Sequence, residues 1–273
     1  AYASAIGRDI RRFDNAKEEI RSLNMGGTAI GTGLNADTTY FHRVVKNMST
    51  ITGEELVQSY DTIDATQNLD SYAMVSGIVK SCAVNLSKMC NDLRLMSSGP
   101  RTGFCEINLP AKQNGSSIMP GKINPVIPEV VNQVAFNIIG NDVTITMAAE
   151  AGQLELNAFE PIIFYNLFES IQTLSNAVQT LVDNCIVGIT ANEEHCREMV
   201  ESSIGIITAI CPYVGYETAA NIAKEALRTN QSVRELILQK KLLSEEQLKT
   251  ILDPYTMTKP GIQGRNPADL LSD

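Results

Sequence analysis

Two stretches of the sequence repeat apolar residues at alternating steps of three and four, and this spacing constrains the fold more than any other feature. Their apolar positions are Val75, Val79, Cys82, Leu86, Met89 and Leu93 in the first, and Phe164, Leu167, Ile171, Leu174, Val178, Leu181 and Cys185 in the second. Such spacing places the side chains on one stripe of a helix. Long helices with one apolar stripe pack into bundles, so we predict an all-α fold built on a long-helix bundle.

The segment between the two stripes is ambiguous in its local pattern. Residues 143–146 read Val-Thr-Ile-Thr, which on β-branched content alone could form a strand. Ile138, Ile145 and Gly152 fit a helical stripe instead. We therefore predict a third long helix here.

The helical pattern of the sequence becomes shorter near residue 190. Three pairs fit a capping box ahead of a short apolar pattern, namely Thr190 with Glu193, Ser232 with Glu235, and Ser244 with Gln247. We expect a central helical-bundle domain over residues 1–189 and a small C-terminal helical domain over residues 190–273. The tail from Lys259, with its Pro and Gly residues, is expected to be loosely ordered.

Composition argues against several classes of partner. The 273 residues carry 22 Lys and Arg against 31 Asp and Glu, a net charge of −9, without a clustered basic surface for nucleic acid. No apolar run reaches membrane-spanning length. The six cysteines form no C-x-x-C pair, which indicates buried free thiols in a reducing compartment and not a zinc site. The sequence therefore predicts a cytoplasmic protein without nucleic-acid or membrane partners.

Glycines concentrate between Gly26 and Asn35. A nucleotide-binding loop at this place would need a preceding strand, and the pattern before it is that of a charged helix. A tight connection between helices is the better interpretation.

The run from Gly115 to Glu129, GSSIMPGKINPVIPE, concentrates chemistry as no other segment does. It joins two hydroxyls, one cation and one amide, at Ser116, Ser117, Lys122 and Asn124. Asn124-Pro125 is a typical helix start, in which Asn caps and Pro occupies the first turn. A helix N-terminus with a nearby cation favours an anionic ligand, and cationic surroundings can activate a serine hydroxyl. An anion-binding catalytic loop and a purely structural turn both remain open at this point.

The Gly115–Glu129 run closely resembles the signature of the aspartase/fumarase superfamily. Further segments resemble the same family: NMGGTAIGTGLN, MCNDLRLMSSGPR, EINLPAKQNGSS and EAGQLELNAFEP. Within the family, PVIPEVVNQVAFNIIGNDVTITMAAEAGQLELN and DPYTMTKPG are more similar to the aspartate ammonia-lyases than to the fumarate hydratases.

The resemblance implies a lyase that eliminates ammonia from a small dicarboxylate, L-aspartate, to give fumarate without a metal or organic cofactor. It assigns a catalytic base to Ser116, substrate contacts to Ser117, Ile118, Met119, Lys122 and Asn124, and a supporting carboxylate to Glu129.

The resemblance also implies a homotetramer whose active sites are shared among subunits. The family's other two site segments, TSTNMN-like and GRTHLQ-like, have no match in this sequence. We therefore expect a form that lacks the N-terminal part and has no lyase activity by itself. A fumarate hydratase of the same fold, or a non-catalytic helical scaffold that oligomerises, are the alternatives.

Overall fold

The computed structural model describes residues 1–113, 115, 118–119, 121 and 123–264. The chain divides into two compact units, Ala1–Thr190 and Ala191–Asp273. Each unit has its own hydrophobic core.

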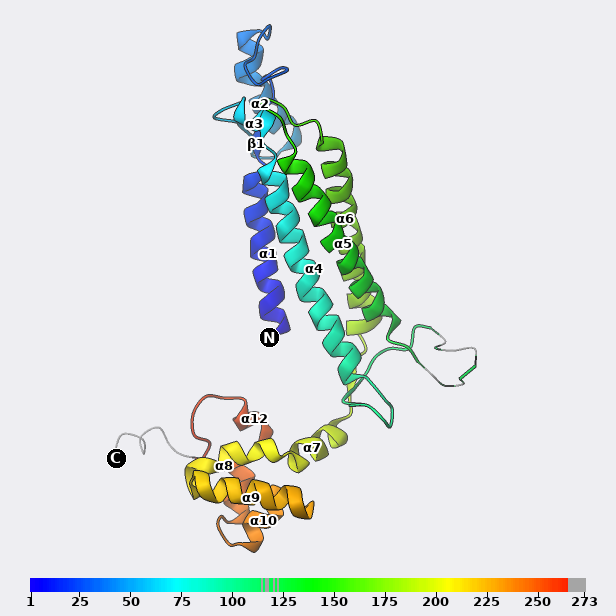
Figure 1. Cartoon of the computed structure of the whole chain (residues 1–273), viewed down its shortest axis with the longest axis vertical. Helices are drawn as coiled ribbons and strands as arrows, with labels where there is room; N and C mark the ends of the chain where they lie inside the picture. The colour runs from blue at the N-terminus through cyan, green and yellow to red at the C-terminus, as the bar shows by residue number, and fades with distance from the viewer. Residues whose placement is uncertain (114, 116–117, 120, 122, 265–273) are drawn as a thin grey trace, which may run out of the picture. The chain divides into compact units, whose positions relative to one another are not determined.

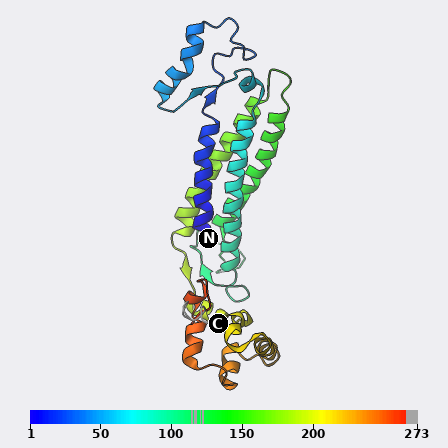
Figure 2. The same ribbon diagram turned by 90° about the vertical axis from the view of Figure 1, so that its left-hand side faces the viewer.

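The first unit is a bundle of long helices, as predicted. Helices α1 (Tyr2–Glu19), α4 (Asp70–Met96), α5 (Val126–Glu150) and α6 (Glu160–Leu181) lie side by side along the bundle (Figures 1 and 2). A π-helical turn, η1 (Val182–Ile186), continues α6. The chain runs along α1, α4, α5 and α6 in alternating directions (Figure 1), so the end of α4 lies near the start of α5.

The core of the first unit follows the apolar stripes. Val79, Leu86 and Leu93 of α4 are buried, as are Leu174 and Leu181 of α6. The ambiguous Val143–Thr146 segment lies inside α5, so the helix prediction is confirmed.

That segment is helical because its apolar side chains follow the 3.6-residue period and not the two-residue period of a strand. Ile138 and Ile145 point into the core and are fully buried, whereas Val143 remains exposed.

Short elements gather at the end of the bundle opposite the start of α5 (Figure 1). These elements are β1 (Ser22–Leu23), α2 (Thr38–Thr52), β2 (Val57–Gln58) and α3 (Asp64–Gln67), with β1 parallel to β2. The glycine-rich segment connects α1 and β1 to α2. Gly31 has φ +85°, and a Cβ there would lie 2.3 Å from Ile63 Cα, so only glycine fits. The glycines therefore serve a tight connection, as predicted.

The second unit is a compact group of short helices. Its elements are β4 (Thr190–Ala191) at the junction, α7 (Glu193–Ser202), η2 (Ile204–Ile206), α8 (Ile207–Val214), α9 (Tyr216–Thr229), α10 (Val233–Gln239), α11 (Glu245–Ile251) and α12 (Pro254–Met257). Ile210, Ile222, Leu236 and Ile237 form the centre of its core. In the tail, Gln263 Nε2 donates to the Lys259 carbonyl at 2.8 Å.

Two of the predicted capping boxes are confirmed and one is wrong. Ser232 caps α10 and Ser244 caps α11, each with the reciprocal bond from the helix. Thr190 does not cap α7, which begins only at Glu193 after Asn192. The Thr190 hydroxyl instead accepts a hydrogen bond from Asn108 Nδ2 at 3.2 Å, next to β3 (Ile107–Asn108). A contact distant in sequence thus replaces the local one.

Within the described part of the chain, none of the helices is long and apolar enough to cross a membrane.

Candidate active site at the start of α5

The Gly115–Glu129 run leads directly into α5 at the end of the bundle where α4 finishes. Three of its predicted site residues, Ser116, Ser117 and Lys122, lie outside the described residues. Ile118 and Met119 are exposed, at 83% and 48%. Both side chains therefore lie at the surface of the first unit.

Asn124 joins the two described ends of the run. Its side chain is half-buried, and Nδ2 donates a hydrogen bond to the Gly115 carbonyl at 2.9 Å. An amide nitrogen carries two hydrogens, so this bond uses one of the two donor positions. The second donor position suits a carboxylate oxygen.

The predicted cap at Asn124 is wrong in its detail. The N-cap of α5 is Pro125, and among the described residues no side chain caps this helix. Pro125 has φ −77° and ψ 57°, which delays the helix by one residue. The Asn124 side chain is engaged with Gly115 instead. The Asn124-Pro125 dipeptide therefore predicts the start of the helix correctly. The Asn124 amide, however, bonds the Gly115 carbonyl and does not cap the helix.

The first turn of α5 offers few amide donors to a ligand. The Val126 N–H donates to the Asn124 carbonyl at 2.9 Å, and the Glu129 N–H donates to the Pro125 carbonyl at 3.2 Å. Pro128 has no N–H. The helix dipole still favours an anion, but a carboxylate bound here would depend mainly on side chains such as the Asn124 amide.

Glu129 faces the end of α4. One carboxylate oxygen, Oε1, lies 3.8 Å from Arg94 Nη2, and both side chains are partly exposed. A pair this long and this exposed contributes little to stability. Arg94 Nη1 also donates to Asn132 Oδ1 at 3.4 Å, so Arg94 contacts two residues of α5 near its start.

Buried polar contacts hold α5 against α4 behind this site. Asn132 is buried and its Nδ2 contacts the Ser87 carbonyl, Ser87 Oγ at 2.8 Å and Asn91 Oδ1 at 3.1 Å. Further along, the buried Asp142 carboxylate accepts from Ser76 Oγ at 2.8 Å and pairs with Lys80.

Sequence reasoning did not identify these supporting residues. The available signal was the spacing of Asn132 and Asp142, which continue the three- and four-residue steps of the apolar positions Ala135, Ile138 and Ile145. Buried polar groups require partners, so such positions predict contacts with polar residues of a neighbouring helix.

Among the residues that the structure describes, no cluster of three or more His, Cys, Asp and Glu side chains could hold a metal ion.

Two family models match this chain. The model described as "Lyase" matches residues 1–140, and the model described as "Fumarase C C-terminus" matches residues 206–259.

Curated relatives extend the likeness over nearly the whole chain. An aspartate ammonia-lyase from a Bacillus species is 56% identical over 97% of this chain and 57% of its own length. The aspartate ammonia-lyase of Bacillus subtilis strain 168 is 54% identical over 97% of this chain and 56% of its own length. The chain spans little more than half the length of these relatives.

Solved structures share the fold. The crystal structure of a Brucella melitensis fumarate lyase:delta crystallin bound to cobalt superposes with a TM-score of 0.91 and 48% identity over 95% of this chain and 56% of its own. Recombinant class II fumarase from Schistosoma mansoni gives a TM-score of 0.88 and 31% identity over 95% of this chain and 57% of its own.

We expect Asn124→Ala to lower the free energy of unfolding of the first unit by about 1 kcal/mol, because the bond to the Gly115 carbonyl is lost. Urea titration followed by circular dichroism measures the change. The control is Asn176→Ala, which removes an exposed amide whose oxygen accepts a hydrogen bond from Gln172 of the same helix at 3.1 Å. Equal effects of the two substitutions would contradict a special role for Asn124.

Proposed function

We propose that this chain carries one part of an aspartate ammonia-lyase active site. The premise is that the chain belongs to the aspartase/fumarase family of lyases. The reaction is the reversible elimination of ammonia from L-aspartate to give fumarate. Relatives named aspartate ammonia-lyase support this choice at 50–56% identity. Because the chain matches little more than half of their length, the complete activity requires residues that this sequence does not contain.

One observation carries the proposal most strongly. The Asn124 amide bonds the Gly115 carbonyl at 2.9 Å, and this contact brings both ends of the run to the start of α5. A small anion bound there would meet the Asn124 amide, the positive end of the α5 dipole and the Lys122 charge. This is the environment that a dicarboxylate substrate needs on a protein with a net charge of −9.

In the proposed reaction, Ser116 removes a proton from the carbon beside the side-chain carboxylate of L-aspartate. The electron pair left by the C–H bond moves into that carboxylate and forms an aci-carboxylate dianion. Positive charge and hydrogen bonds from Lys122 and Asn124 stabilise the dianion. The electron pair then returns to form the C=C bond of fumarate, and ammonia leaves.

The proposal gives the remaining residues of the run supporting roles. Ser117, Ile118 and Met119 contact the substrate, and Glu129 supports the site from the first turn of α5. Glu129 has Arg94 as a neighbour, and this pairing keeps a positive charge close to the carboxylate. No metal or organic cofactor takes part in these steps.

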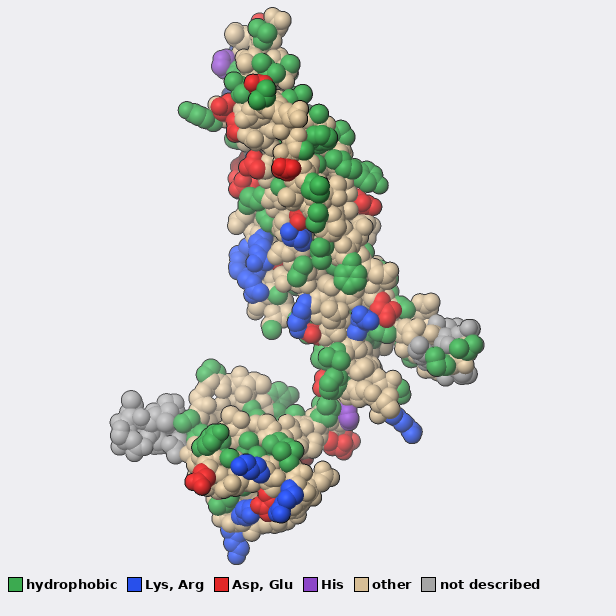
Figure 3. All heavy atoms as spheres, in the orientation of Figure 1, with side chains coloured by type: hydrophobic (Ala, Val, Ile, Leu, Met, Phe, Trp, Pro, Cys, Tyr) green, Lys and Arg blue, Asp and Glu red, His purple; other side chains and the backbone are tan. Residues whose placement is uncertain are grey.

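Subunits share the active sites in this proposal, within a homotetramer. Exposed apolar side chains on α5 and α6 support it, namely Phe136, Ile139, Val143, Met147, Ile162, Tyr165 and Phe168. Hydrophobic side chains are visible along the bundle in Figure 3. Large exposed apolar patches of this kind usually mark protein interfaces.

A cytoplasmic location belongs to the same proposal. Among the described residues, all six cysteines are free thiols. Burial raises the pKa of the Cys90 thiol to about 12, so this thiol stays protonated and unreactive at neutral pH. Such thiols fit a reducing compartment.

A fumarate hydratase is the second candidate function. The match of residues 206–259 to the "Fumarase C C-terminus" model favours it, as does the structural likeness to the Schistosoma mansoni fumarase. The identity to that fumarase is 31%, against 54–56% for the Bacillus aspartate ammonia-lyases. The higher identity supports L-aspartate over L-malate as the proposed substrate.

The substrate can be tested with a chimera. The part of the Bacillus subtilis enzyme without a counterpart here is joined to this chain in one polypeptide, and fumarate is followed by ultraviolet absorbance. We expect fumarate from L-aspartate and none from this chain alone. Ser116→Ala should lower the rate by at least about a hundredfold, because a base contributes that much. The control Ser4→Ala, on the exposed face of α1, should not change the rate.

Fumarate formed by the chimera from L-malate alone would replace the proposal with the hydratase. Fumarate formed from L-aspartate by the unaltered chain alone would contradict the shared site.

The tetramer can be tested by light scattering at micromolar concentration. We expect a mass four times 29.7 kDa for this chain. Phe168→Asp should reduce that mass, because it places a charge in the apolar face of α6. Tyr60→Asp alters a fully exposed aromatic residue outside α5 and α6 and should leave the mass unchanged. A monomeric mass for the unaltered chain would contradict the proposal.

A further inference from the structure

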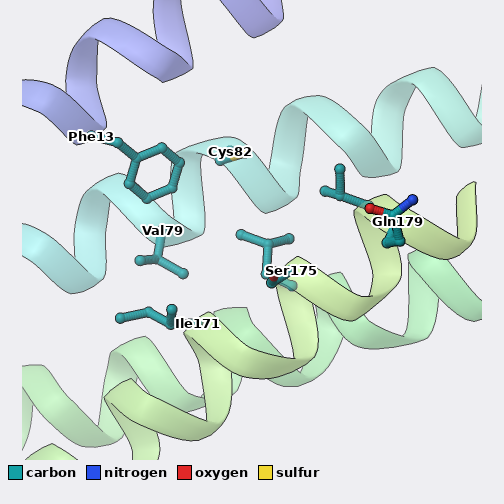
Figure 4. Close-up of a pocket in the computed structure, with 8 residues that line it drawn as sticks. Phe13, Val79, Cys82, Ile171, Ser175 and Gln179 are labelled. Carbon is teal, nitrogen blue, oxygen red and sulfur yellow. The ribbon is translucent and has the colours of Figure 1, made fainter. Parts of the chain in front are cut away.

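Helix α4 carries a polar stripe next to its apolar one. Val79 and Cys82 belong to the apolar stripe and line a groove beside α1 and α6 (Figure 4). Each polar position follows a buried apolar residue of α4 by one place, and these positions are Ser76, Lys80, Ser87, Asn91 and Arg94. One residue turns a helix by about 100°, so the two stripes face different neighbours.

The polar stripe faces α5. Its first four positions contact the buried side chains of Asp142 and Asn132. Its last position, Arg94, lies in the final turn of α4 and reaches Glu129, the residue that ends the Gly115–Glu129 run. The stripe thus connects the buried interior of the bundle to the candidate site.

The buried Asn132 amide is held in one orientation. Its nitrogen, Nδ2, contacts the Ser87 carbonyl at 3.1 Å, Ser87 Oγ at 2.8 Å and Asn91 Oδ1 at 3.1 Å. A backbone carbonyl only accepts hydrogen bonds, so the amide nitrogen and not the amide oxygen must face Ser87. The amide oxygen, Oδ1, is therefore directed at Arg94, whose Nη1 donates to it at 3.4 Å.

Asn132 in turn restricts the direction of the Arg94 guanidinium. This group is a planar, rigid fork, so a bond at Nη1 limits where Nη2 can lie. Nη2 lies 3.8 Å from Glu129 Oε1. Glu129 and Asn132 are three positions apart on α5 and lie on one face of the helix, which lets a single guanidinium contact both.

We propose that Arg94 is a positioning residue that fixes the direction of the Glu129 carboxylate at the candidate site. The inference rests on the proposed function, in which Glu129 supports the reaction. The side chains of Arg94 and Glu129 are 41% and 38% exposed, so their pairing adds little to stability. It supplies direction instead, because a glutamate has many rotamers and a charged partner on a held fork selects those that face α4.

The direction of Glu129 determines which of its oxygens the site can use. Glu129 presents Oε1 to Arg94, and Oε2 is available to a further group of the complete active site. A carboxylate that turned away from α4 would carry Oε2 with it. Misplacement of a supporting group by about 1 Å can lower a reaction rate by about a hundredfold.

A double-mutant cycle tests the inference in the chimera of this chain with the remainder of the Bacillus subtilis enzyme. The variants are Arg94→Gln, Glu129→Gln and the two together, and kcat and KM are measured with L-aspartate. We expect Arg94→Gln to lower kcat at least about tenfold and to leave KM within about twofold, because Arg94 acts on Glu129 and not on the substrate. The double variant should be no slower than Glu129→Gln alone.

A conservative variant and a matched control complete the set. Arg94→Lys keeps the charge but replaces the fork by a single ammonium group, so it should restore only part of kcat. The control is Arg21→Gln, which removes an arginine that pairs with Glu55 at 3.2 Å at the opposite end of the bundle. It should change neither kcat nor KM.

Three results in an active chimera would overturn the inference. They are an unchanged kcat in Arg94→Gln, a rise in KM without a fall in kcat, which would make Arg94 a substrate-binding residue, and losses that add in the double variant.

A crystal structure of the Arg94→Gln variant of this chain tests the contact whether or not the chimera is active. We expect the Glu129 carboxylate to lie about 1 Å or more from its position in the unaltered chain. A carboxylate that keeps its position would overturn the inference. An unaltered chimera that forms no fumarate from L-aspartate would contradict the proposed function, whereas a displaced Glu129 in the variant would still identify Arg94 as the residue that positions it.

Discussion

The contact between α4 and α5 is the interaction on which the rest of the first unit depends. Apolar side chains supply most of its area, but they would also permit one helix to slide along the other. Asn132 and Asp142 are buried, and each contacts two α4 residues one turn apart, Ser87 and Asn91 for Asn132 and Ser76 and Lys80 for Asp142. A shift by one turn would take one of the two α4 partners away from each buried group, at a cost of about 1 kcal/mol for each lost hydrogen bond. The polar contacts therefore fix the alignment.

This alignment determines where the candidate site lies. It brings the end of α4, with Arg94, beside the first turn of α5, with Glu129. It also fixes the position of Asn124, whose amide bonds the Gly115 carbonyl. Since Pro128 and the bonded amides leave few N–H donors in the first turn, the site depends on the side chains of the Gly115–Glu129 run to bind an anion.

The helical bundle could be predicted from sequence because its signal is periodic and long. The buried positions Val79, Leu86 and Leu174 repeat over several turns, and such a pattern tolerates local exceptions. Predictions that depended on a single hydrogen bond were weaker. Thr190 and Asn124 both have the chemistry of a helix cap, but Asn108 and Gly115 are their partners instead. These contacts join residues 82 and nine positions apart, and a local pattern cannot identify them.

The candidate site could also be predicted only in part from the sequence. The sequence indicated that the Gly115–Glu129 run leads into a helix, and the structure shows α5 beginning there. The contributions of Arg94 and Asn132 arise from the pairing of α4 with α5 and have no local signal. The partial exposure of Ile171 and Val178 could not be predicted from the sequence either, because an apolar stripe does not show whether one or two neighbouring helices will cover it. The roles of Ser116, Ser117 and Lys122 remain proposals.

The most direct measurement is a crystal structure of the chimera with bound fumarate. If the start of α5 carries the substrate site, a fumarate carboxylate should lie within hydrogen-bonding distance of Asn124 Nδ2, beside the Gly115–Glu129 run. Fumarate bound elsewhere, with no contact to Asn124 or to any other residue of that run, would contradict the assignment of the site.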